Sequence, residues 1–268
     1  MVHRKTQNQT RKEDLGKMLK VTNTEVFGWG AAIRGMRNPL ESWGKSDTYS
    51  TPSGYKEVTW LIGPNDLALM KKLIAAGSDH SKFMRMIHVQ CDWEAPLYWW
   101  KEADTYKVGT VRNSCSTMHK ITAHEFAMDM FAHEHLFDEE SLPLYEERAD
   151  IDQCEVLAAM DVNGHWCYYT PKTFLNMTCN VLNHFRKLYL ETKDKKYWWQ
   201  LIQLLPSSYL QKATMDLNYA TLRNMYHSRK AHKQDEWRID FCNWVKTLPY
   251  SELITMTKEE LLASIKEE

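Results

Sequence analysis

The last third of the chain constrains the fold more than any other segment. Residues 204–253 contain a leucine-proline break, then a polar loop, then a helix predicted over residues 214–232. Helices usually bury an apolar face, whereas this one carries Asn218, Asn224 and Arg229. Amides and a guanidinium suit a ligand that has acceptor atoms. The pattern therefore predicts either a ligand-binding helix or a solvated helix face with salt bridges.

The spacing of Asn218 and Arg229 predicts that both lie on one side of this helix. At about 100° and 1.5 Å per residue, they differ by about 20° around the axis and lie about 16 Å apart. A long ligand can therefore contact both ends of one helix face. Asn224 points elsewhere, toward another subunit or another part of the ligand.

Length and charge limit the class of protein. The chain has 268 residues and a net charge of −1, so nothing indicates non-specific binding to nucleic acid or to an anionic membrane. No run approaches the ~18 apolar residues of a membrane span. The polar N-terminus lacks the apolar core of a signal peptide. These features predict a cytoplasmic protein.

No internal repeat or Pro/Gly/Ser-rich linker divides the chain, so we expect one domain over residues 1–268. Residues 1–18 are expected to form a mobile or partner-bound arm. The six cysteines form no C-x-x-C pair, so neither a zinc ribbon nor a disulfide framework is indicated. The 11 Trp and 13 Tyr residues indicate either core and subunit-interface packing or a stack around a planar ligand.

The hydrophobic patterns predict many helices and few strands. Alternation of apolar and polar residues predicts a half-buried strand over residues 87–93. Residues 109–117 are expected to form a polar loop, and the acidic segment 139–164 to contain a helix. A capping box is expected at Thr257. The other predicted helices span residues 21–36, 64–76, 96–106, 121–137, 171–203 and 235–246. We therefore expect an α+β fold that is helix-rich with a small antiparallel sheet.

The order of residues in the last third resembles the end of flavin-dependent thymidylate synthases. That family has an "LP" break, an "N…N…R" helix and an "H…W" stretch, matched here by His232 and Trp237. A second likeness is the turn at residues 77–83, which the family uses to bind a flavin phosphate through a hydroxyl. The resemblance implies this role for Ser81, whose hydroxyl by its chemistry alone caps a turn.

The family's "RHR…S.NE.SGRY" sequence is altered in this chain. Thr105, Tyr106 and Lys107 stand in place of Arg-His-Arg, and Cys115 stands in place of the substrate-binding serine. Before the "LP" break, Ile202 replaces the family's arginine. The resemblance covers roughly residues 65–118 and 180–250, and residues 120–175 have no counterpart, which indicates an insertion.

The resemblance implies a homotetramer that binds FAD between subunits. It also implies conversion of dUMP to dTMP with NADPH and methylenetetrahydrofolate, a flavin-dependent methyltransferase reaction in nucleotide biosynthesis. The implied flavin-binding residues are Ser81, Tyr106, Lys107, Asn218 and Asn224. The implied substrate-binding residues are Arg229, Cys115, Ser116 and Arg112, of which Arg229 and Cys115 are also the catalytic candidates.

Two alternatives to this function remain open. The altered sequence and Ile202 favour a related flavoenzyme that modifies another pyrimidine nucleotide. The second alternative is a non-catalytic nucleotide-binding or assembly protein on the same scaffold.

Two smaller patterns have competing interpretations. Cys115 with His119 resembles a nucleophile and base, although buried cysteines are common. His124 and His135 share a face of the predicted helix, but H-E-x-x-H is absent, so a solvated face is expected and no metal site.

Overall fold

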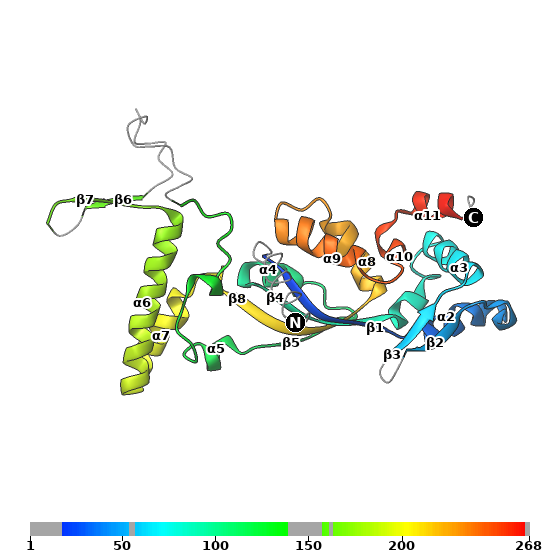
Figure 1. Cartoon of the computed structure of the whole chain (residues 1–268), viewed down its shortest axis with the longest axis horizontal. Coiled ribbons are helices and arrows are strands. Elements are labelled where there is room, and N and C mark those ends of the chain that lie inside the picture. The colour runs from blue at the N-terminus through cyan, green and yellow to red at the C-terminus, as the bar shows by residue number, and fades with distance from the viewer. Residues whose placement is uncertain (1–17, 54–56, 139–156, 161–162, 266–268) are drawn as a thin grey trace, which may run out of the picture. The chain divides into compact units, whose positions relative to one another are not determined.

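The computed structural model describes residues 18–53, 57–138, 157–160 and 163–265, and the chain divides into two compact units (Figure 1). The expectation of a single domain stays a prediction. Most of the expected arm at residues 1–18, and most of the acidic segment 139–164, lie outside the described residues. The first unit contains Met1–Glu94, Lys101–Ser114 and Lys212–Glu268, and the second contains Ala95–Trp100 and Cys115–Gln211.

A four-stranded sheet organises the first unit. Its strand order is β1 (Lys20–Phe27), β4 (His88–Pro96), β8 (Leu210–Asn218) and β5 (Val111–Ser114). β1 pairs antiparallel with β4, and β5 pairs antiparallel with β8. The expected half-buried strand is confirmed as β4, and this small antiparallel sheet confirms the expected fold class.

One face of the sheet packs against the C-terminal helices. These are α8 (Tyr219–Arg229), the π-helix η7 (Glu236–Phe241) and α9 (Cys242–Lys246). Trp93 of β4 meets Phe241 edge-on with ring centroids 6.2 Å apart, and Phe241 meets Trp237 at 5.2 Å. The core of this unit therefore lies between the sheet and the segment that resembles the thymidylate synthases.

The remaining elements of the first unit include two helices, α2 and α3, that a buried ion pair joins. Arg37 Nε donates to Asp66 Oδ1 at 2.6 Å, and both side chains are almost fully buried. Asp66 also accepts from Ser46 Oγ and from the main-chain N–H groups of Asp47 and Thr48. One carboxylate thus fixes the loop before β2 to two helices. These elements are α2 (Trp29–Arg37), η1 (Asn38–Leu40), η2 (Trp43–Lys45), β2 (Tyr49–Ser53), β3 (Glu57–Leu61), α3 (Pro64–Ala75), η3 (Lys82–Met86), α10 (Glu252–Thr255) and α11 (Lys258–Ser264).

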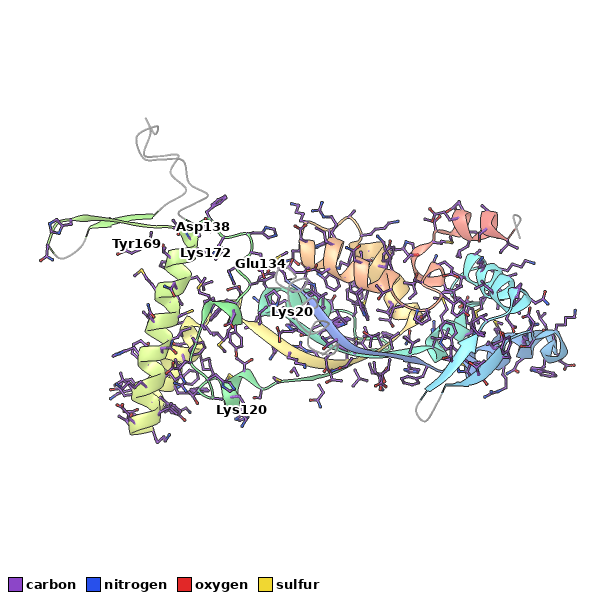
Figure 2. The ribbon with its side chains drawn as sticks, in the orientation of Figure 1. Lys20, Lys120, Glu134, Asp138, Tyr169 and Lys172 are labelled. Atoms are coloured by element: carbon purple, nitrogen blue, oxygen red, sulfur yellow. The ribbon has the colours of Figure 1, made fainter. Side chains whose placement is uncertain are left out.

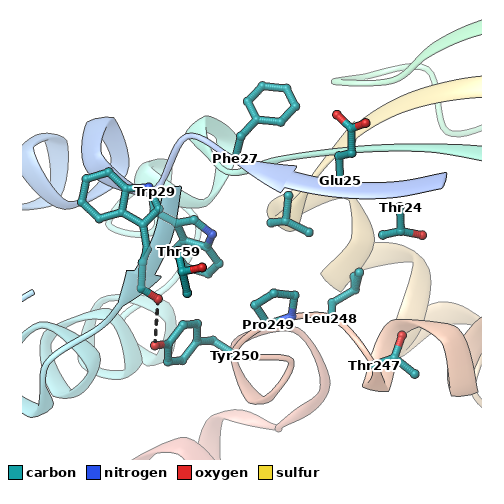
Figure 3. A pocket seen from close by; sticks show the side chains of 11 residues that line it. Thr24, Glu25, Phe27, Trp29, Thr59, Thr247, Leu248, Pro249 and Tyr250 are labelled. Carbon is teal, nitrogen blue, oxygen red and sulfur yellow. Dashed lines mark hydrogen bonds between the residues drawn. The ribbon is translucent and has the colours of Figure 1, made fainter. Parts of the chain in front are cut away.

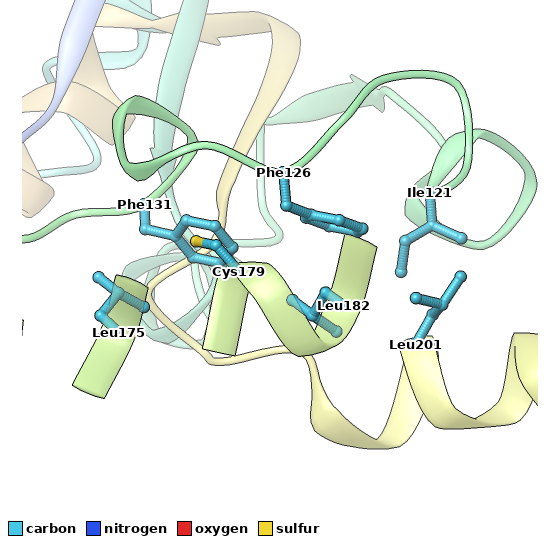
Figure 4. Close-up of a cluster of buried hydrophobic side chains, with 7 residues drawn as sticks. All are labelled: Ile121, Phe126, Phe131, Leu175, Cys179, Leu182 and Leu201. Atoms are coloured by element: carbon cyan, nitrogen blue, oxygen red, sulfur yellow. The ribbon is translucent and has the colours of Figure 1, made fainter. Parts of the chain in front are cut away.

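The second unit is built on two helices, α6 (Pro171–Thr192) and α7 (Lys195–Leu204), and its core cluster is buried between them and an extended segment (Figure 4). At one end of α6, Lys172 Nζ lies 3.1 Å from Asp138 Oδ2, and Figure 2 labels both residues. The cluster consists of Ile121, Phe126, Phe131, Leu175, Cys179, Leu182 and Leu201. The smaller elements are α5 (Thr117–Lys120), η4 (Met128–Met130), β6 (Leu157–Met160) and β7 (Trp166–Tyr169), while α4 (Leu97–Ala103) begins here and ends in the first unit.

Several expected elements differ from the structure. The helix expected over residues 214–232 is wrong in its first turn, because β8 continues to Asn218, which caps α8. The helix expected over residues 171–203 is two helices, since Lys193 adopts a left-handed conformation with φ of 58°. Residues 121–137 form no α-helix and contain only the short 3-10 helix η4. Their apolar side chains pack into the core cluster of the second unit from an extended segment.

Two further expected segments differ from the structure, and three expected features are confirmed. Residues 21–36 form strand β1 and then helix α2, and the expected loop 109–117 contains β5. Helix α3 begins at Pro64 and ends before Gly77, as expected. Helix α4 starts after Pro96, and the capping box at Thr257 is present.

Candidate functional site

Arg229 lies at the last residue of α8 and is held by two side chains from one segment. Its Nε donates to Tyr106 Oη at 2.9 Å, and its Nη1 donates to Glu102 Oε2 at 2.8 Å. The guanidinium also lies over the Tyr106 ring at 5.4 Å and over the Trp237 ring at 5.0 Å. Cation–π contact and a charge-assisted hydrogen bond therefore fix its position before any ligand binds.

The same carboxylate joins a third side chain. His232 Nε2 lies 3.3 Å from Glu102 Oε2, so one oxygen faces two cationic or donor groups. The Arg229 side chain keeps 17% of its surface exposed, and its Nη2 makes no hydrogen bond to any described residue. Two of the five guanidinium N–H groups are thus used, and the two N–H groups of Nη2 have no partner among the described residues, while Glu102 competes with a ligand for Nη1.

The first turn of α8 anchors the loop that carries Lys107. Asn218 Oδ1 accepts from Thr221 N at 2.9 Å, and Thr221 Oγ1 donates to Val108 O at 3.0 Å. Gly109 has a φ of 71°, and a Cβ there would lie 2.4 Å from Asn218 Nδ2. Only glycine permits this approach, so Asn218 both caps the helix and positions the loop.

Three of the expected flavin-binding residues have polar groups that no described residue satisfies. Ser81 is the N-cap residue of η3, which packs against α8, and its side chain makes no cap hydrogen bond. Lys107 and Asn224 are exposed and form no ion pair or side-chain hydrogen bond within the described part of the chain. All three are connected to α8. Ser81 precedes η3, which packs against α8; Lys107 lies on the loop that the first turn of α8 anchors; and Asn224 is part of α8.

Two of the other expected substrate residues, Arg112 and Ser116, have local structural partners. Arg112 Nη1 donates to both oxygens of Asp104 at 2.7 and 2.6 Å. Ser116 Oγ accepts from His119 N and caps α5. Cys115 is exposed, and no hydrogen bond joins its thiol to the His119 ring in the part of the chain that the structure describes. The structure therefore does not assemble the nucleophile and base considered from the sequence.

Cys115 and Ser116 belong to the second unit, whereas Arg112 and Arg229 belong to the first. Their roles beside a nucleotide stay predictions. Among the described residues, no three His, Cys, Asp or Glu side chains gather as a metal site would require. Within the same ranges, no helix is long and apolar enough to cross a membrane.

A cavity of about 670 Å³ in the first unit contains none of the expected site residues (Figure 3). Its walls are residues 24–27 of β1, Trp29, residues 59–60 of β3, and the loop 247–250. This volume is in the range of small-molecule sites. Sequence reasoning missed it because the three walls are far apart in the chain and share no motif.

His227 on α8 makes stability depend on pH. Burial lowers the pKa of this histidine, and the nearby cations Arg223 and Lys230 lower it further. Because the unfolded chain takes up the proton more readily, this effect leaves stability unchanged above a pH of about 6.5 and reduces it as the pH falls below that value. Urea unfolding at pH 7.5 and pH 5 should show the loss, at no more than about 1.4 kcal/mol per pH unit.

The control for this prediction is His227→Gln, which keeps a polar side chain but does not titrate. The variant should show a smaller loss of stability between the two pH values, while the other histidines contribute equally to both proteins. An identical pH dependence in the two proteins contradicts the assignment.

Comparison with known proteins gives structural matches alone. No protein-family profile matches the chain, and no curated protein matches its sequence. The fold is similar to thymidylate synthase X (ThyX) from Helicobacter pylori, crystallised with FAD and dUMP, with a TM-score of 0.56 and 16% identity over 88% of this chain and 95% of that one. A second structure of flavin-dependent thymidylate synthase ThyX from Helicobacter pylori gives 0.55 and 17% over 87% and 96%.

The chain is also similar to the UMP/dUMP methylase PolB from Streptomyces cacaoi, bound with 5-Br UMP, with a TM-score of 0.49 and 12% identity over 93% and 95% of the two chains. The two thymidylate synthase matches show that this chain has the fold of a flavin-dependent thymidylate synthase. The fold expected from the resemblance is therefore confirmed. These matches do not test whether residues 105–107 replace the family's "RHR" sequence, so that replacement stays a prediction.

Proposed function

We propose that the chain is a flavin-dependent enzyme of the thymidylate synthase type that methylates dUMP to dTMP with FAD, NADPH and methylenetetrahydrofolate. The observation that carries the proposal is the shared fold, which spans 95% of a chain crystallised with FAD and dUMP. Fold alone does not define a reaction, so the residues around α8 must supply the second argument.

The residues around α8 fit a flavin nucleotide in part. Ser81, Lys107 and Asn224 offer a hydroxyl, an ammonium and an amide, which suit the phosphates and hydroxyls of FAD. FAD, when bound, supplies hydride transfer, and the protein supplies binding and orientation. Asn218 acts by positioning the loop of Lys107, and Tyr106 acts by holding Arg229.

Arg229 is the proposed nucleotide-binding residue. Its Nη2, which makes no hydrogen bond within the described ranges, donates to an acceptor of the nucleotide, and the carboxylate of Glu102 competes with that nucleotide. The proposed substrate contacts also include Arg112, Cys115 and Ser116, for which the resemblance is the only support. Cys115 is, with Arg229, a proposed catalytic residue.

The test is turnover with purified protein, FAD, NADPH and methylenetetrahydrofolate, followed by chromatography of the nucleotide. dUMP should yield dTMP. Replacing dUMP by UMP or dCMP tests the alternative, a related enzyme that modifies another pyrimidine nucleotide. This alternative is favoured by Tyr106 and Lys107, which replace a histidine and an arginine of the family. Binding of nucleotide and FAD with no product from any of the three contradicts the enzymatic proposal and favours a binding protein.

The proposal includes a homotetramer with two-fold symmetry, because aromatic side chains are enriched at subunit interfaces. Exposed aromatic residues in the described ranges include Trp43, Phe174 and Trp199. Light scattering at low micromolar concentration should give about four times the chain mass of 31.7 kDa. A particle of one chain mass contradicts the tetramer and removes any shared-subunit site.

A further inference from the structure

The carboxylate of Glu102 occupies one side of the Arg229 guanidinium, where an anionic ligand would bind. Glu102 Oε2 accepts from Arg229 Nη1 at 2.8 Å, and Tyr106 Oη accepts from Arg229 Nε at 2.9 Å. A phosphate that makes paired hydrogen bonds therefore uses Nη1 and Nη2, and it must displace the carboxylate from Nη1. The Glu102 side chain keeps 34% of its surface exposed, so neighbouring side chains do not enclose it.

His232 is the other side chain beside this carboxylate, and its hydrogen bonds define its tautomer. Its Nδ1 accepts from the main-chain N–H of Gln234 at 3.2 Å, so the proton of the neutral ring lies on Nε2. Nε2 lies 3.3 Å from Glu102 Oε2. The main-chain N–H of His232 donates to Arg229 O at 2.9 Å, which fixes the histidine to the end of α8. His232 can therefore stay beside Glu102 when the carboxylate leaves Arg229.

The balance of charge at this cluster changes when an anion binds. Without a ligand, the carboxylate of Glu102 balances the guanidinium of Arg229, and a neutral His232 adds no charge. A phosphate on Arg229 takes over that balance and leaves Glu102 beside a second anion, which is unfavourable. A proton taken from solvent by His232 Nδ1 restores the balance, although the hydrogen bond from Gln234 N is then lost.

Histidine is the residue type that changes its charge near neutral pH. The segments that adjoin His232 also carry the ionisable side chains of Tyr106, Lys230, Lys233, Asp235 and Glu236. Tyrosine, lysine, aspartate and glutamate ordinarily titrate outside the range of about pH 5–8, whereas histidine titrates within it. His227, also on α8, lies beside the cations Arg223 and Lys230. His232 is therefore the group that can balance a displaced Glu102.

We propose that His232 is a positioning residue that takes up a proton and holds Glu102 away from Arg229 when the phosphate of a nucleotide binds. This inference rests on the proposed function, in which Arg229 binds the nucleotide. One proton from solvent enters with each nucleotide, so affinity falls as the pH rises and protons become scarcer. Complete coupling changes the dissociation constant by about tenfold per pH unit.

Calorimetric titration of the full chain with dUMP counts the protons that accompany binding. Titrations at pH 7.5 in HEPES and in Tris differ in heat by the number of protons exchanged, because the two buffers have different ionisation enthalpies. Wild type should take up about 0.5 to 1 proton per dUMP, and its dissociation constant should rise by about 3- to 10-fold from pH 7 to pH 8. This range lies above the second ionisation of the phosphate itself, at about pH 6.

Three variants identify the group that takes up the proton. His232→Gln keeps a donor beside Glu102 but cannot titrate, so proton uptake should fall to about zero and affinity should no longer depend on pH. Glu102→Gln removes the displaced charge and should also lose the uptake while it still binds dUMP. His184→Gln changes an exposed histidine of α6 and should keep the uptake of wild type. A thermal melt checks that each variant is folded, and Glu102→Gln gives the same test if His232→Gln does not fold.

Sulfate separates this inference from the proposed function, because it is a dianion over the whole pH range and is not a nucleotide. If sulfate binds with the expected uptake but dUMP does not bind, the nucleotide site is wrong and the role of His232 stands. The inference is overturned if folded His232→Gln takes up as many protons as wild type, if wild type takes up fewer than about 0.2 protons with either anion, or if neither anion binds at millimolar concentration.

Discussion

Asp66→Asn should lower the free energy of unfolding by about 3–5 kcal/mol, because it leaves the buried guanidinium of Arg37 without its counter-charge. Asp66 is fully buried, and its carboxylate accepts hydrogen bonds from Arg37, Ser46, Asp47 and Thr48. The asparagine keeps the size of the side chain but presents an N–H₂ group to donors. Urea unfolding of the variant and of wild type measures the difference.

The pH dependence of this site has a defined sign. Burial raises the pKa of Asp66, but hydrogen bonds from Ser46, Thr48 and Arg37 outweigh it, and the pKa ends below the ordinary value of 3.8. The carboxylate therefore contributes stability above that pH, and the contribution is lost as the pH falls through the lowered pKa. Asp66→Asn should remove this contribution at all pH values.

Two comparisons make the Asp66 prediction decisive. Asp79→Asn changes an exposed aspartate and should alter stability by less than about 0.5 kcal/mol. The double variant Arg37→Met with Asp66→Asn should be more stable than the sum of the two single changes predicts, because neither partner remains charged. Stability of Asp66→Asn within 1 kcal/mol of wild type, on the scale of roughly 3–5 expected for a broken buried pair, contradicts the assignment.

Arg229→Ala should weaken nucleotide binding by roughly 10- to 150-fold, which corresponds to the ~1.5–3 kcal/mol of one charge-assisted hydrogen bond. Arg229→Lys should be nearly as damaging, because an ammonium cannot reproduce the planar guanidinium. Calorimetric titration with dUMP measures both losses. The structure adds a second effect that the sequence did not indicate. Removing the partly exposed pair with Glu102 should also lower stability, by about 1 kcal/mol or less.

Glu102→Gln is the matched control for the Arg229 prediction. This variant removes the same ion pair but leaves the guanidinium in place, so its stability should fall by a similar amount. Its affinity for dUMP should equal or exceed that of wild type, since the competing carboxylate is gone. If Arg229→Ala binds dUMP as tightly as wild type, or if both variants lose affinity equally, Arg229 is structural and the site assignment is wrong.

Local patterns predicted the elements whose signals are local. Alternation identified β4, and Pro64 with Gly77 identified the ends of α3. The same reasoning placed the start of α8 too early, because buried Ala213, Met215 and Leu217 have the two-residue period of a strand. Asn218 ends this strand, and its side chain caps α8. Interpreting the same amide as a ligand-binding group misses the cap.

The candidate site was predictable in part. Asn218 and Arg229 lie at the two ends of α8, but Asn218 is its extended N-cap, so the shared helix face expected from the spacing stays a prediction. The partner of Arg229 was not predictable, since Glu102 is 127 positions away and only the fold brings it within 2.8 Å. The break after α6 carried a readable signal, because Asp194 caps α7 through Lys196 N. The cavity beside β1 carried none, as its lining residues come from three segments far apart in the chain.

The central claim is that this fold binds a flavin and a pyrimidine nucleotide around α8. The visible absorption spectrum of the purified protein, followed by FAD titration of any flavin-free protein, tests it most directly. We predict flavin bands on purification or a micromolar dissociation constant for FAD, and a weaker constant for a variant that combines Ser81→Ala with Asn224→Ala. No bound chromophore and no change in flavin absorption or fluorescence at high micromolar FAD would contradict the account.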